Sequence, residues 1–384
     1  MAIYFDNAAT TYPKPEGVYR AQDLYFRQAA NPGRGAHALA LESARAVFET
    51  RLLLARFLGV VNAERLIFTG GCTQALNMAI KGMGWRHNDL VVTSPLEHNS
   101  VMRPLKQLEQ SHGISVKPLP YASSGVVDLE ELERCLAELR PRVVVVAEAS
   151  NVTGELVDLP AVAGICRHYQ VPLLVDAAQS AGFVESRIEE LGISMWCASG
   201  HKGLMGPPGV GVLYVSSNVD LEPLIAGGTG SRSEDLEMPP AYPDKLEAGT
   251  LPGPAIVALG AGVSWLEATG LTNVREHETA LADRFLTWAA DCRQLHVYGA
   301  GRGARRTGIV AFQVRDVTAD RVADVLDRDC GIAVRSGLHC ASLAHRALGT
   351  IETGLVRASF GYFNTLYEVD ELCRALENII GSKL

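Results

Sequence analysis

The chain has 384 residues, 47% of them hydrophobic, and carries a formal net charge of −8 at pH 7 with a pI near 5.7. Binding to nucleic acid or to an anionic membrane needs a basic face, so this balance argues against both partners. No apolar run approaches the roughly 18 to 20 residues that cross a bilayer, and the first residues lack the basic start and long apolar stretch of a signal peptide. The eight cysteines have no paired spacing, which indicates reduced thiols, and we therefore expect a cytoplasmic protein.

Short apolar runs alternate with helical patterns through the first half of the chain. The expected strands are residues 65–69, 90–94, 115–119, 142–147, 172–176, 194–198 and 210–215. Helical patterns fall between several of them, at residues 74–83, 129–139 and 161–169. This alternation predicts an α/β fold whose mainly parallel sheet is covered by helices on both faces.

The character of the sequence changes at residues 227–250, which are rich in Gly, Ser, Pro and acidic residues and predict a long loop. Helices are expected after it at residues 255–267 and 274–290, followed by shorter β and α segments. We therefore predict a large α/β domain over residues 16–255. A smaller α+β domain would combine residues 1–15 with residues 256–384.

Two residues near the ends of expected strands carry the most specific chemistry. Asp176 ends a buried apolar run, and Lys202 follows the next one within the sequence Ser199-Gly200-His201-Lys202. Pyridoxal 5'-phosphate (PLP) requires a lysine for a Schiff base and an acid for its pyridinium nitrogen. A lone lysine in a Gly-rich turn is more often a solvated surface residue, but the acid upstream favours a cofactor site.

Other candidates lie at neighbouring strand ends. Cys72 and Thr73 begin an expected helix after a Gly-Gly turn, where backbone N–H groups and the helix dipole suit a phosphate; an ordinary capped turn is the alternative. His98 follows another strand and could stack on a cofactor ring. The amide of Asn151 could bind a cofactor hydroxyl, although asparagine is also common in such a turn for backbone reasons.

A set of motifs stands in one order between residues 4 and 359. These are Tyr4-Phe5-Asp6-Asn7-Ala8-Ala9-Thr10, Thr73, Glu97-His98, Ser150-Asn151, Asp176-Ala177-Ala178-Gln179, Ser199-Gly200-His201-Lys202, Glu247-Ala248-Gly249-Thr250, Arg335-Ser336-Gly337-Leu338-His339-Cys340 and Arg357-Ala358-Ser359. Together they resemble the cysteine desulfurase family of the class V aminotransferase fold, in the group that includes selenocysteine lyases. The resemblance implies a PLP-dependent transferase of fold type I, with a seven-stranded, mainly parallel sheet, acting as a homodimer.

The resemblance also implies a role for each matching residue. Lys202 would hold PLP, Asp176 would pair with the ring nitrogen, Gln179 would contact the ring hydroxyl and His98 would stack on the ring. Thr73, Ser199 and His201 would bind the phosphate with Thr250 of the other subunit, and Cys72 stands where a hydroxyl residue is common. Asn151 and Arg357 would bind the substrate carboxylate. Cys340 would be the nucleophile, and Arg335, itself a substrate-binding candidate, or His339 would supply the positive charge that a thiolate needs.

The implied reaction converts L-cysteine to L-alanine and leaves the sulfur on Cys340 as a persulfide. A cysteine or cystine C–S lyase and a selenocysteine lyase are alternatives on the same fold. A sulfur carrier with little catalysis is a third possibility, which Lys202 and Asp176 argue against. A sulfur-acceptor protein is an expected partner that the sequence does not identify. Leu338 and Ser342 depart from the family pattern, and Glu148 places an extra carboxylate that we expect near the ring.

Overall fold

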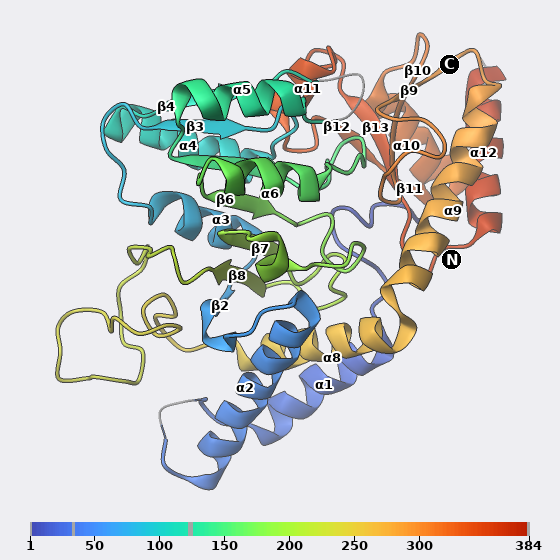
Figure 1. Ribbon diagram of the computed structural model, residues 1–384. Coiled ribbons are helices and arrows are strands. Elements are labelled where there is room, and N and C mark those ends of the chain that lie inside the picture. Colours follow the sequence, from blue (N-terminus) through green and yellow to red (C-terminus); the bar gives the residue numbers. More distant parts are fainter. Residues whose placement is uncertain (1, 33–34, 122–125, 382–384) are drawn as a thin grey trace.

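The computed structural model describes residues 2–32, 35–121 and 126–381, and a seven-stranded sheet forms its centre (Figure 1). Its strands lie in the order β2 (Leu66–Thr69), β8 (Gly211–Val215), β7 (Met195–Ser199), β6 (Leu173–Asp176), β5 (Val143–Ala147), β3 (Leu90–Thr93) and β4 (Ser115–Pro118). The run from β7 to β4 is parallel, whereas β8 is antiparallel to both of its neighbours. All seven expected strands are confirmed, each within one residue at either end.

The strand β5 shows why the sheet is buried on both faces. It consists of four valines and an alanine, all buried, and β-branched side chains suit such a strand. Val143 and Val145 belong to the core that contains α3 (Cys72–Lys81) and α4 (Asn99–His112). Val144 and Val146 pack on the opposite side, in the core that contains side chains of α2 (Ala38–Leu58), α5 (Leu129–Leu139), α6 (Leu159–His168) and α8 (Gly253–Thr269). The alternation of side chains along one strand therefore fixes two helical layers.

A second, antiparallel sheet lies beside the large one, in the order β12 (Arg335–Gly337), β13 (Leu355–Ser359), β10 (Ile309–Val314) and β9 (Leu295–Tyr298). Its core includes side chains of α9 (Leu271–Ala290), α10 (Ala319–Cys330) and α12 (Leu366–Gly381). The N-terminal strand β1 (Ile3–Tyr4) pairs in parallel with β11 (Ile332–Ala333), so the start of the chain lies against its last third. The remaining helices are α1 (Glu16–Gln28), the short 3-10 turn Ala63–Arg65, α7 (Ile188–Leu191) and α11 (Ser342–Ala347).

The segment between the two sheets follows the sequence-based expectation in part. Residues 227–250 contain no helix or strand, as predicted, and the two expected helices after them are α8 and α9. Ile256 and Val263 of α8 pack in the core of the large sheet, beyond the predicted boundary at residue 255, so that boundary stays a prediction.

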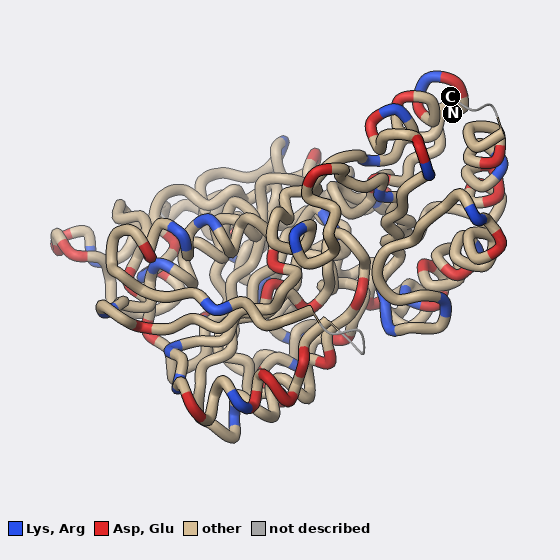
Figure 2. Tube along the Cα trace, turned by 90° about the horizontal axis from the view of Figure 1, so that it is seen from above, with Lys and Arg blue, Asp and Glu red and all other residues tan. Residues whose placement is uncertain are grey.

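Charged residues of both signs are spread along the chain. Figure 2 shows Lys and Arg interspersed with Asp and Glu along the trace. Within residues 2–32, 35–121 and 126–381, no single helix is long and apolar enough to cross a membrane; α8 and α9 meet the length and composition criteria only as a pair, bent by 84°.

Candidate active site

The residues expected to hold a cofactor meet at one edge of the large sheet. Asp176 is the last residue of β6 and Ser199 the last of β7, and the carboxyl ends of parallel strands are where open α/β sheets place their ligands. One cavity there is lined by Cys72, Thr73, His98, Asn151, Asp176, Gln179, Ser199, His201 and Lys202. Thr250 is the single cofactor-binding candidate outside it.

Lys202 lies in the turn between β7 and β8, where side chains of the N-terminal segment donate hydrogen bonds to the backbone. The hydroxyl of Thr11 donates to the carbonyl of Lys202 at 3.1 Å, and the Nζ of Lys14 donates to the carbonyl of His201 at 2.7 Å. Burial lowers the pKa of Lys202, while the charge of Asp176 acts in the opposite direction. Burial and the nearby lysines also lower the pKa of His201, to about 4, so this ring is neutral at pH 7.

Asp176 is 5% exposed and its Oδ1 accepts two hydrogen bonds. The backbone N–H of Ala178 lies at 2.9 Å, and the Sγ of Cys72 lies at 3.4 Å. Burial, followed by the charge of Asp176, raises the pKa of the Cys72 thiol well above its ordinary value, so the thiol keeps its proton and donates it. The side chain of Cys72 therefore contacts Asp176. The backbone N–H of Cys72, 3.4 Å from the Oγ of Ser199, is the donor that this residue offers at the start of α3.

His98 is the N-cap of α4 and faces the same cavity. Its Nδ1 accepts the backbone N–H of Ser100 at 3.0 Å and lies 2.9 Å from the Oγ of Ser100. The same Oγ lies 2.9 Å from the Oγ1 of Thr73, in the first turn of α3. Burial lowers the pKa of His98 below its ordinary value. A chain of hydroxyl groups thus connects the beginning of α3 with the imidazole.

Arg357 and Asn151 present unpaired polar atoms in a buried place. The Nη1 of Arg357 donates to the carbonyl of Asn151 at 2.8 Å, and its Nη2 donates to the Oδ1 of Asp6 at 2.8 Å. Among the described residues, neither the Nε of Arg357 nor the Oδ1 of Asn151 has a hydrogen-bond partner. Because buried polar atoms are nearly always paired, this donor and this acceptor fit a polar ligand that binds between them.

Cys340 is exposed and its loop is fastened to the cavity at two points. The N–H of Asn99 donates to the carbonyl of Cys340 at 2.8 Å, and the side chain of Asn151 donates to the carbonyl of His339 at 2.7 Å. His339 and Cys340 have φ values of 50° and 55°, a left-handed conformation uncommon outside glycine. The Sγ of Cys340 lies 3.8 Å from the Nη2 of Arg335, so a cation stands beside the candidate nucleophile.

His339 does not supply a second positive charge. It is buried, and its Nδ1 lies 3.4 Å from the Nε2 of His345. Burial, reinforced by the charge of Arg357, lowers the pKa of His339 to about 3. The expectation that this histidine could stabilise a thiolate as a cation is therefore wrong, and Arg335 is the candidate that remains.

Three other residues that were expected at the site are placed differently from the expectation or have other partners. Thr250 is exposed on the loop of residues 227–250, three residues after Glu247, whose carboxylate receives both Nη groups of Arg51 at 2.8 Å. Gln179 lines the cavity but donates from Nε2 to the carbonyl of Ala8 at 2.9 Å. Glu148, whose carboxylate was expected near the ring, does not line the cavity; its buried carboxyl group accepts a hydrogen bond from the hydroxyl of Ser180.

The sequence-based interpretation missed four contributors to this site: Asp6, Lys14, Glu97 and Ser100. Asp6, Glu97 and Ser100 lie in or directly beside the motifs described above, and their contacts became apparent only from the structure. Lys14 lies outside those motifs, and burial lowers the pKa of its amine to about 8.

Comparison with known proteins assigns the fold and the site to a family. The aminotransferase class-V family matches residues 3–372. A probable cysteine desulfurase of Methanothermobacter thermautotrophicus is 35% identical and covers 99% of this chain and 95% of its own length; the cysteine desulfurase of Dickeya dadantii is 31% identical, with 98% and 91% covered. The structure of a cysteine desulfurase from Thermococcus onnurineus superposes with a TM-score of 0.92 at 31% identity, covering 99% of this chain and 95% of that one.

The chain therefore belongs to the aminotransferase class-V family, whose members depend on PLP. Within it, full-length relatives and structural neighbours alike place the chain among the cysteine desulfurases. The residues of the cavity fit PLP: an amine at Lys202, a buried acid at Asp176, a helix N-terminus at Thr73 and the unpaired Oδ1 of Asn151.

Proposed function

We propose that this chain binds PLP through Lys202 and transfers the sulfur of L-cysteine to Cys340, with release of L-alanine. The proposal is supported by the lysine and acid that share one cavity and by the exposed thiol that is tethered to its rim. When bound, PLP withdraws electrons from the α-carbon of an amino acid and so weakens the bonds around it. Residues of this chain bind the substrate, move its proton and accept its sulfur.

The substrate carboxylate is bound by Arg357 and by the Nδ2 of Asn151, which has a second hydrogen besides the one donated to the His339 carbonyl. A guanidinium group has five N–H donors, and Asp6 and the Asn151 carbonyl engage two of them in Arg357, which leaves Nε and two further hydrogens for the carboxylate. The contacts with Asp6 and Asn151 also fix the plane of the guanidinium group, so its remaining N–H donors are already oriented when the substrate carboxylate binds.

Lys202 moves the proton at the α-carbon. Burial lowers the pKa of its amine, which raises the neutral fraction that can accept a proton near pH 7. Asp176 has two donors on Oδ1, from Ala178 and Cys72, and these hold the carboxylate in place for a ring nitrogen. The base and the acid thus come from adjacent strand ends of one sheet.

The sulfur step takes place at Cys340. The thiolate Sγ attacks the substrate sulfur, an S–S bond forms and the bond from Cβ to sulfur breaks. Cβ keeps the electron pair and takes up a proton, so the products are alanine and a persulfide, and no outside oxidant is needed. The guanidinium group of Arg335, 3.8 Å from Sγ, places a positive charge beside the sulfur that attacks.

A second copy of the chain completes the site in this proposal. Thr250 is exposed and lies outside the cavity of its own chain, so it is free to meet the phosphate in a partner. The persulfide on exposed Cys340 is then available to a sulfur-acceptor protein.

The observation that carries the proposal is the position of Cys340, hydrogen-bonded through its carbonyl to the start of α4 and beside Arg335. The test is to give the purified holoenzyme L-cysteine and a reductant and to quantify alanine, pyruvate and sulfide. We expect alanine in step with sulfide, and the loss of both in Cys340→Ala. Cys330→Ala, which removes another exposed cysteine, should leave both rates unchanged. Pyruvate that is formed equally well by Cys340→Ala would instead identify a C–S lyase and overturn the proposal.

A further inference from the structure

We propose that Ser100 is a positioning residue that keeps His98 neutral, with its ring proton on Nε2. The inference rests on the proposed function, in which His98 lies against the bound cofactor. It assigns a role to a side chain that contacts the imidazole and the beginning of α3 simultaneously.

The first argument is the capping geometry of α4. This helix begins at Asn99, so His98 is its N-cap and Ser100 its second residue, and an N-cap side chain accepts the amide of that residue. The Ser100 N–H points at Nδ1 from 3.0 Å. A backbone amide can donate but never accept, so Nδ1 must present its lone pair and the single proton of the neutral ring must lie on Nε2.

The second argument is the direction of the hydroxyl chain. Ser100 and Thr73 each have one hydroxyl hydrogen, and their oxygens are 2.9 Å apart. When the Thr73 hydroxyl donates to an anion at the start of α3, we infer that the Ser100 hydrogen is directed at Nδ1, which lies 2.9 Å from the Ser100 oxygen. Nδ1 is then an acceptor toward both groups of Ser100, because a proton on it would confront the amide hydrogen of Ser100.

The surrounding charges do not change when Ser100 is replaced. Burial is the main cause of the lowered pKa of His98; the charge of Asp176 opposes it, and those of Lys202, Arg335 and Arg357 reinforce it. A Ser100 variant therefore isolates the contribution of one hydroxyl group from that of the charged groups.

The consequence concerns which proton transfers are open to His98. Its Nδ1 faces α4 and is occupied, so the cavity receives the Nε2–H side of the ring. In this state His98 can donate a hydrogen bond from Nε2, but it neither accepts a proton from the substrate nor gives one up, because loss of the Nε2 proton would leave an imidazolate anion. Lys202 then remains as the group that removes the proton from the α-carbon.

The test follows the ring nitrogens of His98 by NMR in holoenzyme labelled with ¹⁵N-histidine, from about pH 5 to 8, a range that spans the ordinary pKa of histidine. The signal of His98 is identified by its absence in His98→Gln. We expect the neutral, Nε2-protonated form in the parent protein. Ser100→Ala keeps the amide and removes the hydroxyl, so the tautomer should persist while the protonation constant of the ring rises about tenfold, the scale of one hydrogen bond.

Ser100→Thr is the matched control, because it keeps the hydroxyl and should retain the parent protonation constant. An Nδ1-protonated ring in the parent, or an unchanged constant in Ser100→Ala, would overturn the inference. The measurement needs no turnover, so it is separable from the proposed function. A protein with the expected tautomer that forms no alanine would contradict the desulfurase mechanism alone.

Discussion

Asp6 and Arg357 form an ion pair of 2.8 Å between Oδ1 and Nη2, although 351 positions separate them in the chain. The side chain of Arg357 is 2% exposed and that of Asp6 is 23% exposed. The N–H of Ser359, two residues after Arg357, donates to the carbonyl of Phe5 at 2.7 Å, so backbone and side chains join the same two segments. The N-terminal segment thus holds Arg357, the arginine that we propose binds the substrate carboxylate.

The first prediction concerns this ion pair. Asp6→Ala leaves a buried guanidinium without its counter-charge, and we expect it to lower the free energy of unfolding by about 3 kcal/mol. Urea unfolding of the variant and the parent measures the change. Asp23→Ala, which breaks an exposed pair with Arg27 on α1, serves as the control and should change stability very little. Equal, small losses in the two variants would mean that Asp6 does not stabilise Arg357.

The sequence was sufficient to predict the elements whose residues repeat a local pattern. The strand β5 was predictable because four valines in succession suit a strand that is buried on both faces. The cavity was predictable to the extent that its residues follow strand ends, as Asp176 follows β6. These signals are local and depend on few residues.

What the sequence could not predict depends on contacts between distant segments. No local pattern shows that Asp6 neutralises Arg357, or that the Cys72 thiol turns toward Asp176. The charge state of His339 depends on burial, which a histidine next to a reactive cysteine does not reveal. Such properties follow from the packing of the whole chain.

The second prediction compares the contributions of Cys72 and Thr73 to PLP binding. The Cys72 thiol contacts Asp176, whereas the Thr73 hydroxyl lies on the outer side of the same helix turn, 2.9 Å from Ser100. We expect Cys72→Ala to change the dissociation constant of PLP by no more than about twofold, because the amide of Ala178 still donates to Asp176. Thr73→Val should raise the constant about tenfold, since of the two residues Thr73 is the one with a hydroxyl donor for the phosphate. Absorbance titration of cofactor-stripped protein measures both constants. A tenfold loss in Cys72→Ala with none in Thr73→Val would reverse the two roles.

The third prediction concerns Glu97, a fully buried carboxyl group that accepts the N–H of Ala147 at 2.7 Å. Burial raises its pKa from 4.5 to about 8. Between these values the folded chain binds one more proton than the unfolded chain, so the free energy of unfolding falls as pH rises, by up to about 1.4 kcal/mol per pH unit. Glu97→Gln cannot titrate, and we expect its stability relative to the parent to increase steadily from pH 5 to pH 8.

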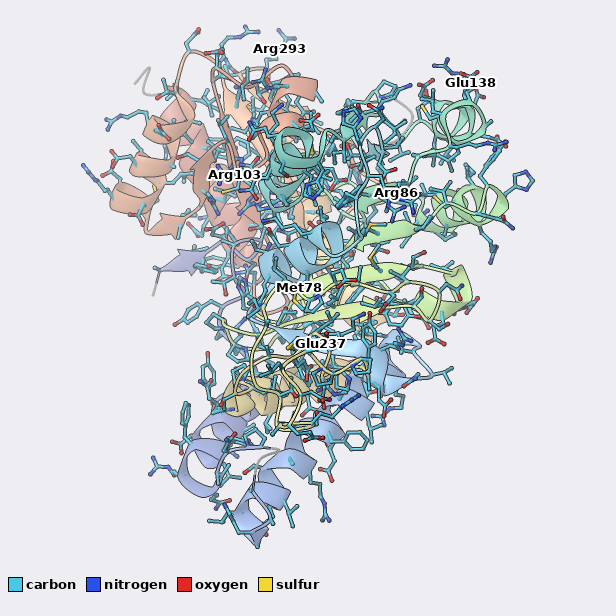
Figure 3. All side chains as sticks on the ribbon, turned by 90° about the vertical axis from the view of Figure 1, so that its left-hand side faces the viewer. Met78, Arg86, Arg103, Glu138, Glu237 and Arg293 are labelled. Atoms are coloured by element: carbon cyan, nitrogen blue, oxygen red, sulfur yellow. The ribbon has the colours of Figure 1, made fainter. Side chains whose placement is uncertain are left out.

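Urea unfolding at several pH values measures this difference. The matched control is Glu138→Gln on α5, whose side chain is 60% exposed and points outward from the molecule (Figure 3). Its stability relative to the parent should not depend on pH in this range. A Glu97→Gln curve parallel to that of the parent would show that this carboxyl group is ionised in the folded protein.

The last prediction concerns Arg335 and the reactivity of Cys340. The guanidinium group lies 3.8 Å from Sγ, and its positive charge attracts negative charge that develops on the reacting sulfur; at the dielectric constant of water this attraction is about 1 kcal/mol, or about fivefold in rate. We therefore expect Arg335→Ala to slow the alkylation of Cys340 by iodoacetamide at pH 7 about fivefold, and Arg335→Lys to retain most of the rate. Mass spectrometry of the Cys340 peptide measures the rate, and Cys330 provides an internal control, because it is exposed and its pKa is raised by burial and by Asp329. If Cys340 and Cys330 slowed equally in Arg335→Ala, the effect would be a general loss of reactivity, and the guanidinium group would have no specific role at the sulfur.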